Sequence, residues 1–211
     1  MNGVTFGTNH SYDVYSLILT GKTIEAPEAK KYTVDIEGGD GELDLTEYFG
    51  RVNYKNRKLS FDFEAITSKV DFPTFFSTIF NDLHGKKMKV ILDDDPNYFY
   101  YGRLSVKATH SKKISKITIE VDAEPYKYKL NQTTVSRSIS GSDTVLLTND
   151  VLSVVPSITA SAAFTIVFNG VTTAVSAGTF TIPTLELSAG SNSVSVTGTG
   201  TISFTWQEGR L

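Results

Sequence analysis

The chain has 211 residues, a formal net charge of -3 and no cysteine. Its hydrophobic share of 40% and charged share of 20% predict a folded chain and exclude the composition of a disordered one. The lack of cysteine excludes disulfides, thiolate catalysis and cysteine-ligated metal centres. The negative charge disfavours non-specific binding to DNA. No apolar run approaches the roughly 20 residues that span a bilayer, so we expect a soluble chain without a signal peptide or membrane anchor.

The composition changes near residue 130. Of the 20 Lys and Arg residues, 18 precede this point, as do all ten tyrosines. Residues 131–211 contain 28 Ser and Thr residues and only four acids. This contrast predicts two domains, 1–130 and 131–211, joined around Lys129–Ser142, where polar residues run almost unbroken from Asn131 to Asp143.

The first domain is predicted to consist of strands around one helix. Leu59, Phe61 and Phe63 alternate with polar residues, which is typical of a half-buried strand. A helix is predicted over about 71–84, because its apolar residues recur at helical spacing. These residues are Phe72, Phe75, Phe76, Ile79, Phe80 and Leu83. We expect all six to be buried and to dock the helix on a sheet.

Local signals fix the ends of this helix and the strands after it. Asp71 is the expected N-cap, Pro73 fits the first turn, and Gly85 can adopt the left-handed conformation after the last turn. A strand is then predicted over Met88–Leu92, followed by a turn over Asp93–Asn97. A hairpin comes next, with alternating apolar residues over 104–108 and 117–123 and a polar connection over His110–Lys113.

The second domain is predicted to be a β-sandwich without helices, since short alternating strands and turn signals recur along it. Phe164–Phe168 forms one strand, and Asn169 and Gly170 supply the two positive-φ residues of a type I′ hairpin. Three further apolar pairs or triplets alternate in the same way. They are Phe180 and Ile182, Val194 and Val196, and Ile202, Phe204 and Trp206.

The sequence contains no recognisable catalytic, cofactor-binding or metal-binding motif. His10, His84 and His110 stand apart in the sequence, each without a partner at metal-ligand spacing, and His84 suits the C-terminal end of the helix dipole. The run Asp93–Asp95 could bind a hard cation, but it lacks the calcium-loop pattern, so a solvated turn is favoured. The aromatic run Tyr98–Tyr101 alternates between faces, which favours core on one side and a subunit contact on the other.

A family resemblance begins in the segment from Val34 to Glu47. In siphophage distal tail proteins, a Gly-rich stretch of the form Asp-Gly-x-x-Asp-Leu-Thr/Ser leads into a strand with the pattern Tyr-x-x-Arg, and this chain is similar. The matching residues are Asp40, Gly41, Asp44, Leu45, Thr46, Tyr54, Asn56 and Arg57. The pair Gly38-Gly39 departs from common members. The segment from Leu187 to Val196 and the terminal strand also resemble the galectin-like C-terminal sandwich of the family.

The resemblance implies a mainly β fold: an N-terminal β-barrel or sandwich-like domain with one amphipathic helix, then a galectin-like β-sandwich. It implies a non-enzymatic structural component of a phage or prophage tail tip or baseplate, in which copies form a hexameric ring hub between the tail tube and the tip proteins. The implied partners are the chain itself, the tail tube protein and a tail-associated tip protein, with DNA only in transit.

The implied location is the tail tip of the virion, after assembly in the cytoplasm of the bacterial host. For such a ring, residues 20–50 are the expected arm that pairs with a neighbouring subunit, because they are long, Gly-containing and poorly periodic. A carbohydrate-binding module or host-receptor adhesin is the alternative function, motivated by the Ser/Thr-rich second domain with Trp206. The alternation of Trp206 with Ile202 and Phe204 favours core packing instead. A hydrolase would need an acid pair that the sequence does not single out.

Overall fold

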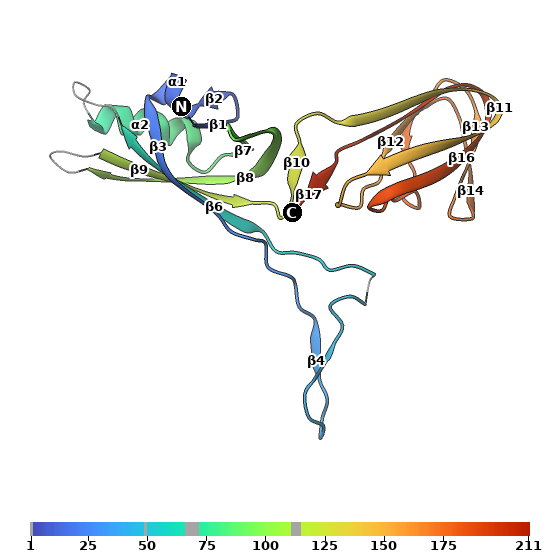
Figure 1. The fold of residues 1–211 in the computed structure, drawn as a ribbon, viewed down its shortest axis with the longest axis horizontal. Helices are drawn as coiled ribbons and strands as arrows, with labels where there is room; N and C mark the ends of the chain where they lie inside the picture. The colour runs from blue at the N-terminus through green and yellow to red at the C-terminus, as the bar shows by residue number, and fades with distance from the viewer. Residues whose placement is uncertain (1, 49, 66–71, 111–114) are drawn as a thin grey trace. The chain divides into compact units, whose positions relative to one another are not determined.

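A computed structural model describes residues 2–48, 50–65, 72–110 and 115–211 (Figure 1). The chain divides into two compact units. The first is Met1–Lys127 together with Leu211, and the second is Tyr128–Arg210. The fold is mainly β, as predicted. Neither described helix is long and apolar enough to cross a membrane.

The first unit is built on an antiparallel sheet with the strand order β2-β1-β7-β8-β9-β6-β3. The bounds of its strands are Val4–Phe6 (β1), Asn9–His10 (β2), Leu17–Ile24 (β3), Arg57–Ala65 (β6), Lys87–Leu92 (β7), Asp95–His110 (β8) and Ser115–Ala123 (β9). The chain also forms helices α1 (Ser11–Tyr15) and α2 (Phe72–Leu83), and a separate hairpin of β4 (Thr33–Asp35) and β5 (Glu42–Asp44) between β3 and β6. Strand β10 (Lys127–Lys129) contains the boundary between the units.

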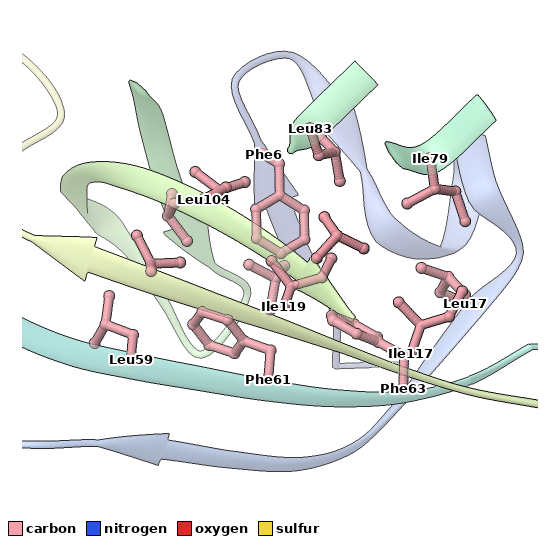
Figure 2. Close-up of a cluster of buried hydrophobic side chains, with 14 of the residues drawn as sticks. Phe6, Leu17, Leu59, Phe61, Phe63, Ile79, Leu83, Leu104, Ile117 and Ile119 are labelled. Carbon is pink, nitrogen blue, oxygen red and sulfur yellow. The ribbon is translucent and has the colours of Figure 1, made fainter. Parts of the chain in front are cut away.

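The core of the first unit lies between this sheet and α2 (Figure 2). Leu59, Phe61 and Phe63 of β6 are all at most 1% exposed, which confirms the predicted alternation. The ring of Phe6 on β1 meets Phe61 and Phe63 edge-on, at centroid distances of 6.0 and 6.2 Å. Strand β6 therefore supplies the aromatic centre of this core.

Helix α2 confirms the predicted position but not the predicted depth of burial. Ile79 and Leu83 are fully buried, whereas Phe80 is 37% exposed, so the expectation of six buried side chains is wrong. Ile79 and Leu83 lie at the centre of the apolar stripe and Phe80 at its edge, and the stripe is wider than the face that the sheet covers. Pro73 lies in the first turn, and Gly85 has a φ of 75° just after the helix.

Two local predictions for the first unit are wrong. A single helix was predicted, but the chain also forms α1, whose five residues are too few for a periodic signal. At the start of α1, the side chain of His10 accepts a hydrogen bond from the Asp13 amide. The turn predicted over Asp93–Asn97 is shorter, because β8 begins at Asp95 and includes Pro96. The predicted N-cap Asp71 and most of the connection at 110–113 lie outside the described residues.

The second unit is a β-sandwich organised by one long strand, β16 (Gly190–Trp206). Strand β11 (Thr133–Asn149) pairs with β16 along its whole length. On its other side, β16 pairs first with β13 (Phe164–Phe168) and then with β12 (Ser157–Ala160). The remaining strands are β14 (Val171–Val175), β15 (Gly178–Thr181) and the short β17 (Gly209–Arg210), which pairs with β10.

Several predictions for the second unit are confirmed. The hairpin between β13 and β14 turns at Asn169 and Gly170, whose φ angles are 49° and 80°, as a type I′ turn requires. Trp206 is 2% exposed within the core of this unit. The polar stretch from Asn131 to Asp143 is not a junction, however: most of it belongs to β11, where Ser and Thr side chains line an exposed ladder with β16.

A glycine substitution tests the tight packing of the first sheet. A β-carbon at Gly102 would lie 2.6 Å from the carbonyl oxygen of Asp122 and 2.6 Å from Cγ1 of Val121. We expect Gly102→Ala to lower the free energy of unfolding by about 1–3 kcal/mol, because backbone must move. Gly21→Ala is the matched control, since its new methyl would meet nothing closer than 3.5 Å. Equal urea midpoints for the two variants would contradict this packing.

Candidate functional site

The most distinctive surface of the chain is the extended segment between β3 and β6, residues 25–56, which we call the arm. Figure 1 shows it leaving the sheet in blue and turning back at the β4–β5 hairpin. Residues 20–24 of the predicted arm still belong to β3, so the arm begins at Glu25. In the hairpin, Val34 lies opposite Leu43 and Asp35 lies opposite Glu42.

This hairpin has two chemically different faces. Side chains two residues apart share a face of a strand, so Tyr32, Val34 and Ile36 lie on the same side as Leu43. These four apolar side chains are 47%, 51%, 52% and 51% exposed, in that order. The opposite face carries the pairs Thr33 with Asp44 and Asp35 with Glu42. The arm is therefore an amphipathic ribbon with its apolar side exposed.

An isolated ribbon of this kind is poorly stable in water. A two-stranded hairpin alone is marginal, because it lacks a second layer on which to pack. Full burial of an apolar side chain of this size is worth about 1.5–3 kcal/mol, so covering four that are half-exposed contributes about 1 kcal/mol each. The arm gains this stabilisation only when another surface covers its apolar face.

The residues of the family motif shape this arm. Asp44 accepts a hydrogen bond from the Thr46 amide at 2.8 Å, and the Thr46 hydroxyl accepts one from the Tyr32 amide at 3.2 Å. Hydrogen bonds from the Thr46 hydroxyl and amide lower the pKa of Asp44 below its ordinary value. The Asp44-Leu45-Thr46 motif thus closes the base of the hairpin. Asp40 and Gly41 lie in the exposed turn at its tip, where Gly41 has a φ of 82°.

Arg57 fixes the other end of the arm to the sheet. Its side chain is only 7% exposed, and its Nε donates to the carbonyl oxygen of Glu25 at 2.8 Å. Nη1 donates to the carbonyl oxygen of Pro125 at 3.3 Å, and the guanidinium lies 5.3 Å from the centre of the Tyr100 ring. One buried cation therefore joins the first residue of the arm, strand β8 and the segment after β9.

Tyr54 makes a second contact at the foot of the arm. Its backbone forms an isolated bridge with Ala29, which holds the two sides of the arm together. Its ring packs edge-on against Tyr126 at a centroid distance of 6.1 Å. The two residues of the Tyr-x-x-Arg pattern, Tyr54 and Arg57, are thus anchors of the arm.

The histidines occupy structural positions. His10 was expected to stand alone, which is wrong: folding brings it within 3.0 Å of Asp13 and 3.2 Å of Asp93. His84 follows α2, where Nδ1 accepts a hydrogen bond from the Val106 amide at 3.1 Å. The side chain of His110 lies outside the described residues. Within the described parts of the chain, no group of three or more His, Asp or Glu residues could hold a metal ion.

The acidic run at the β7–β8 turn is divided among different partners. Asp93 accepts from the Gly3 amide at 2.7 Å. Asp94 pairs with Lys22, which lowers the pKa of Asp94, and Asp95 pairs with Lys127 at 2.6 Å. Because each carboxylate faces its own donor, the run does not form a common cation site.

The aromatic run on β8 is covered by lysine side chains and the core. Tyr100 belongs to the core of the first unit. The ammonium groups of Lys127, Lys89 and Lys87 lie 4.8, 4.3 and 4.7 Å from the ring centres of Tyr98, Phe99 and Tyr101, respectively. These cation–π contacts explain why the rings do not form an open stacking platform.

The segment from Leu187 to Val196, which resembles the C-terminal sandwich of the family, also has a structural role. Asn192 is 7% exposed, and its Oδ1 accepts a hydrogen bond from the Ser188 amide at 2.9 Å. Its Nδ2 donates to the carbonyl oxygens of Ser188, Gly190 and Leu147, at 2.9, 3.1 and 3.3 Å. The hydrogen bonds of Asn192 therefore stabilise the turn that leads into β16 and connect this turn to β11.

The architecture of the chain is similar to that of a phage tail hub protein. One solved structure with this fold is that of SPP1 Dit (gp 19.1), described as a paradigm of the hub adsorption apparatus in phages that infect Gram-positive bacteria. The TM-score is 0.71 at 16% sequence identity, and the alignment covers 100% of each chain. No family model and no curated protein matches. The predicted resemblance to distal tail proteins is confirmed in the fold.

The contribution of Arg57 can be tested against a neighbouring cation. Arg57→Met removes the donors to Glu25 and Pro125 while keeping the bulk of the side chain. We expect the free energy of unfolding to fall by about 1–3 kcal/mol, because two partly buried hydrogen bonds from a buried cation are lost. Lys55→Met is the control: Lys55 and its partner Glu28 are largely exposed, so its loss costs under about 1 kcal/mol. Similar urea unfolding curves for both variants would refute the anchoring role.

The hydrogen bonds of Thr46 make a separate prediction for titration. In Thr46→Val the hydroxyl is lost, so we expect the pKa of Asp44 to rise toward its ordinary value, whereas Thr46→Ser retains the low pKa. Carboxyl chemical shifts followed by NMR against pH measure both. Because the folded pKa is lowered, the contribution of Asp44 to arm structure is present above its unfolded pKa and is lost as the pH falls through the folded pKa. An unchanged titration in Thr46→Val would contradict the hydroxyl contact.

Proposed function

We propose that the chain is a structural subunit of a phage or prophage tail tip, where copies assemble into a hexameric ring hub. The ring joins the tail tube to the tip proteins, and DNA passes through its channel. The observation that carries the proposal is the exposed apolar face of the arm. Tyr32, Val34, Ile36 and Leu43 require a covering surface, and in a ring the neighbouring subunit supplies it.

The arm of the first unit supports a ring over a two-fold dimer. An arm that leaves one part of a subunit meets a different part of its neighbour, and such head-to-tail contacts close into rings. The likeness of the whole chain to SPP1 Dit supports the same assembly, and the number six comes from the family resemblance. The partners in this proposal are further copies of the chain, the tail tube protein and a tail-associated tip protein.

The proposed role is non-enzymatic, and its place is the tail tip of the virion. The motif residues support this, because Asp44, Thr46, Tyr54 and Arg57 all shape or anchor the arm. The adhesin alternative rested on Trp206 as a sugar platform. Its indole is 2% exposed within the core of the second unit, so it offers no face to a sugar.

Substitutions on the two faces of the arm test the assembly. We expect Val34→Asp combined with Leu43→Asp to abolish rings, because two charges would be buried against the neighbour. Thr33→Lys adds a charge on the opposite face, where it lies across from Asp44, and should leave ring formation intact. Native mass spectrometry at micromolar concentration, with negative-stain imaging, counts the subunits. A wild-type chain that stays monomeric even with the tail partners present would sink the proposal.

A further inference from the structure

One side of α2 carries an aromatic row among uncharged side chains, in which Phe76 is partly buried against the core and Phe80 is 37% exposed. Phe76, Phe80 and His84 follow at four-residue spacing, with ring centroids 5.6 Å apart in the first pair and 4.0 Å apart in the second. The one charged residue of the helix, Asp82, accepts a hydrogen bond from the Tyr15 hydroxyl at 3.2 Å. The exposed residues around the row are Pro73, Thr74, Ser77, Thr78 and Asn81. Aromatic residues without neighbouring charges are typical of the centre of a protein interface.

Exposed apolar side chains elsewhere do not form a comparable surface. Outside the arm, the described residues of the first unit expose large apolar side chains only at Tyr12, Val14, Phe80 and the terminal Leu211. The first two belong to α1, which the Tyr15–Asp82 hydrogen bond links to α2. In the described second unit, exposed apolar residues belong to separate segments, as single ones on most surfaces do. They are Leu130, Leu146, Val151 and Val171.

The arm and α2 also match in length and charge. The apolar face from Tyr32 to Ile36 is about 16 Å long at 3.3 Å per residue, and α2, with 12 residues, is about 18 Å long. Residues 35–44 at the end of the arm contain five acids and no Lys or Arg. Just beyond the C-terminal end of α2, Lys86 is exposed.

We propose that the arm of one subunit lies along α2 of the neighbouring subunit. Its apolar face covers Phe80 and the exposed part of Phe76, and its acidic turn lies over Lys86. The acids on the other face of the hairpin then remain in water. This inference rests on the proposed ring, and it names the surface that receives the arm. Since donor and receptor surfaces differ, each subunit uses both at once, which is the arrangement that closes a ring.

Engineered cysteines test this contact cleanly, because the chain has none of its own. One batch carries Leu43→Cys on the apolar face of the arm, and a second carries Ser77→Cys on the exposed side of α2, one turn before Phe80. After mixing, assembly and mild oxidation, we expect a disulfide between residues 43 and 77 of different chains, identified by peptide mass spectrometry. Ser138→Cys, exposed on β11, replaces the second batch as the control for random collision.

A second variant measures the energetic weight of the aromatic row. We expect Phe80→Ser to raise the concentration at which half of the chains are in rings by about tenfold or more, as loss of an interface anchor does. Its thermal unfolding as a monomer should change little, because Phe80 is partly exposed. If the wild-type chain forms rings but the two cysteine variants give no 43–77 disulfide above the control level, or if rings are unaffected by Phe80→Ser, the docking site is overturned while the ring proposal stays intact. A wild-type chain that forms no ring overturns both.

Discussion

Strand β6 contributes side chains both to the core of the first unit and to the anchor of the arm, so the position of the arm depends on the packing of this core. Leu59, Phe61 and Phe63 fix the strand in the core, where Phe6 packs on its rings. At the beginning of the same strand, Arg57 holds the start of the arm through the Glu25 carbonyl group. A buried strand therefore sets the point at which the arm leaves the sheet.

The arm satisfies its hydrogen bonds within the chain but leaves its apolar face uncovered. Its local geometry is satisfied within the chain, by the Asp44–Thr46 turn and the bridge between Ala29 and Tyr54. Its apolar face is not, since Val34, Ile36 and Leu43 are each about half exposed. Hydrogen bonds within the ribbon are directional and can be met locally, whereas hydrophobic burial needs a second layer. In the proposed ring, a neighbouring copy supplies this layer.

The second unit differs from the first in composition, with many Ser and Thr residues and few charged ones. Both halves of β16 contribute inward side chains to its core, including Val194 and Val196 from the first half and Phe204 and Trp206 from the second. Its outward positions are Ser and Thr, which pair across strands, as Thr134 does with Thr205 at 3.0 Å. Such a surface is polar without being charged, so this unit differs from the first in surface chemistry while sharing the all-β architecture.

The sequence by itself determined the periodic elements: the β6 alternation, the position of α2 and the Asn169-Gly170 hairpin, because each depends on neighbours in the chain. The long, Gly-containing and poorly periodic stretch over residues 20–50 also located the arm, although its first residues belong to β3. Only the tertiary structure decided which residues meet: it buried Arg57 among carbonyl groups, brought His10 to Asp93 and left Phe80 at the edge of the stripe. It also made β11 from a stretch that composition assigned to a junction. These outcomes depend on partners tens of residues away, which local spacing does not encode.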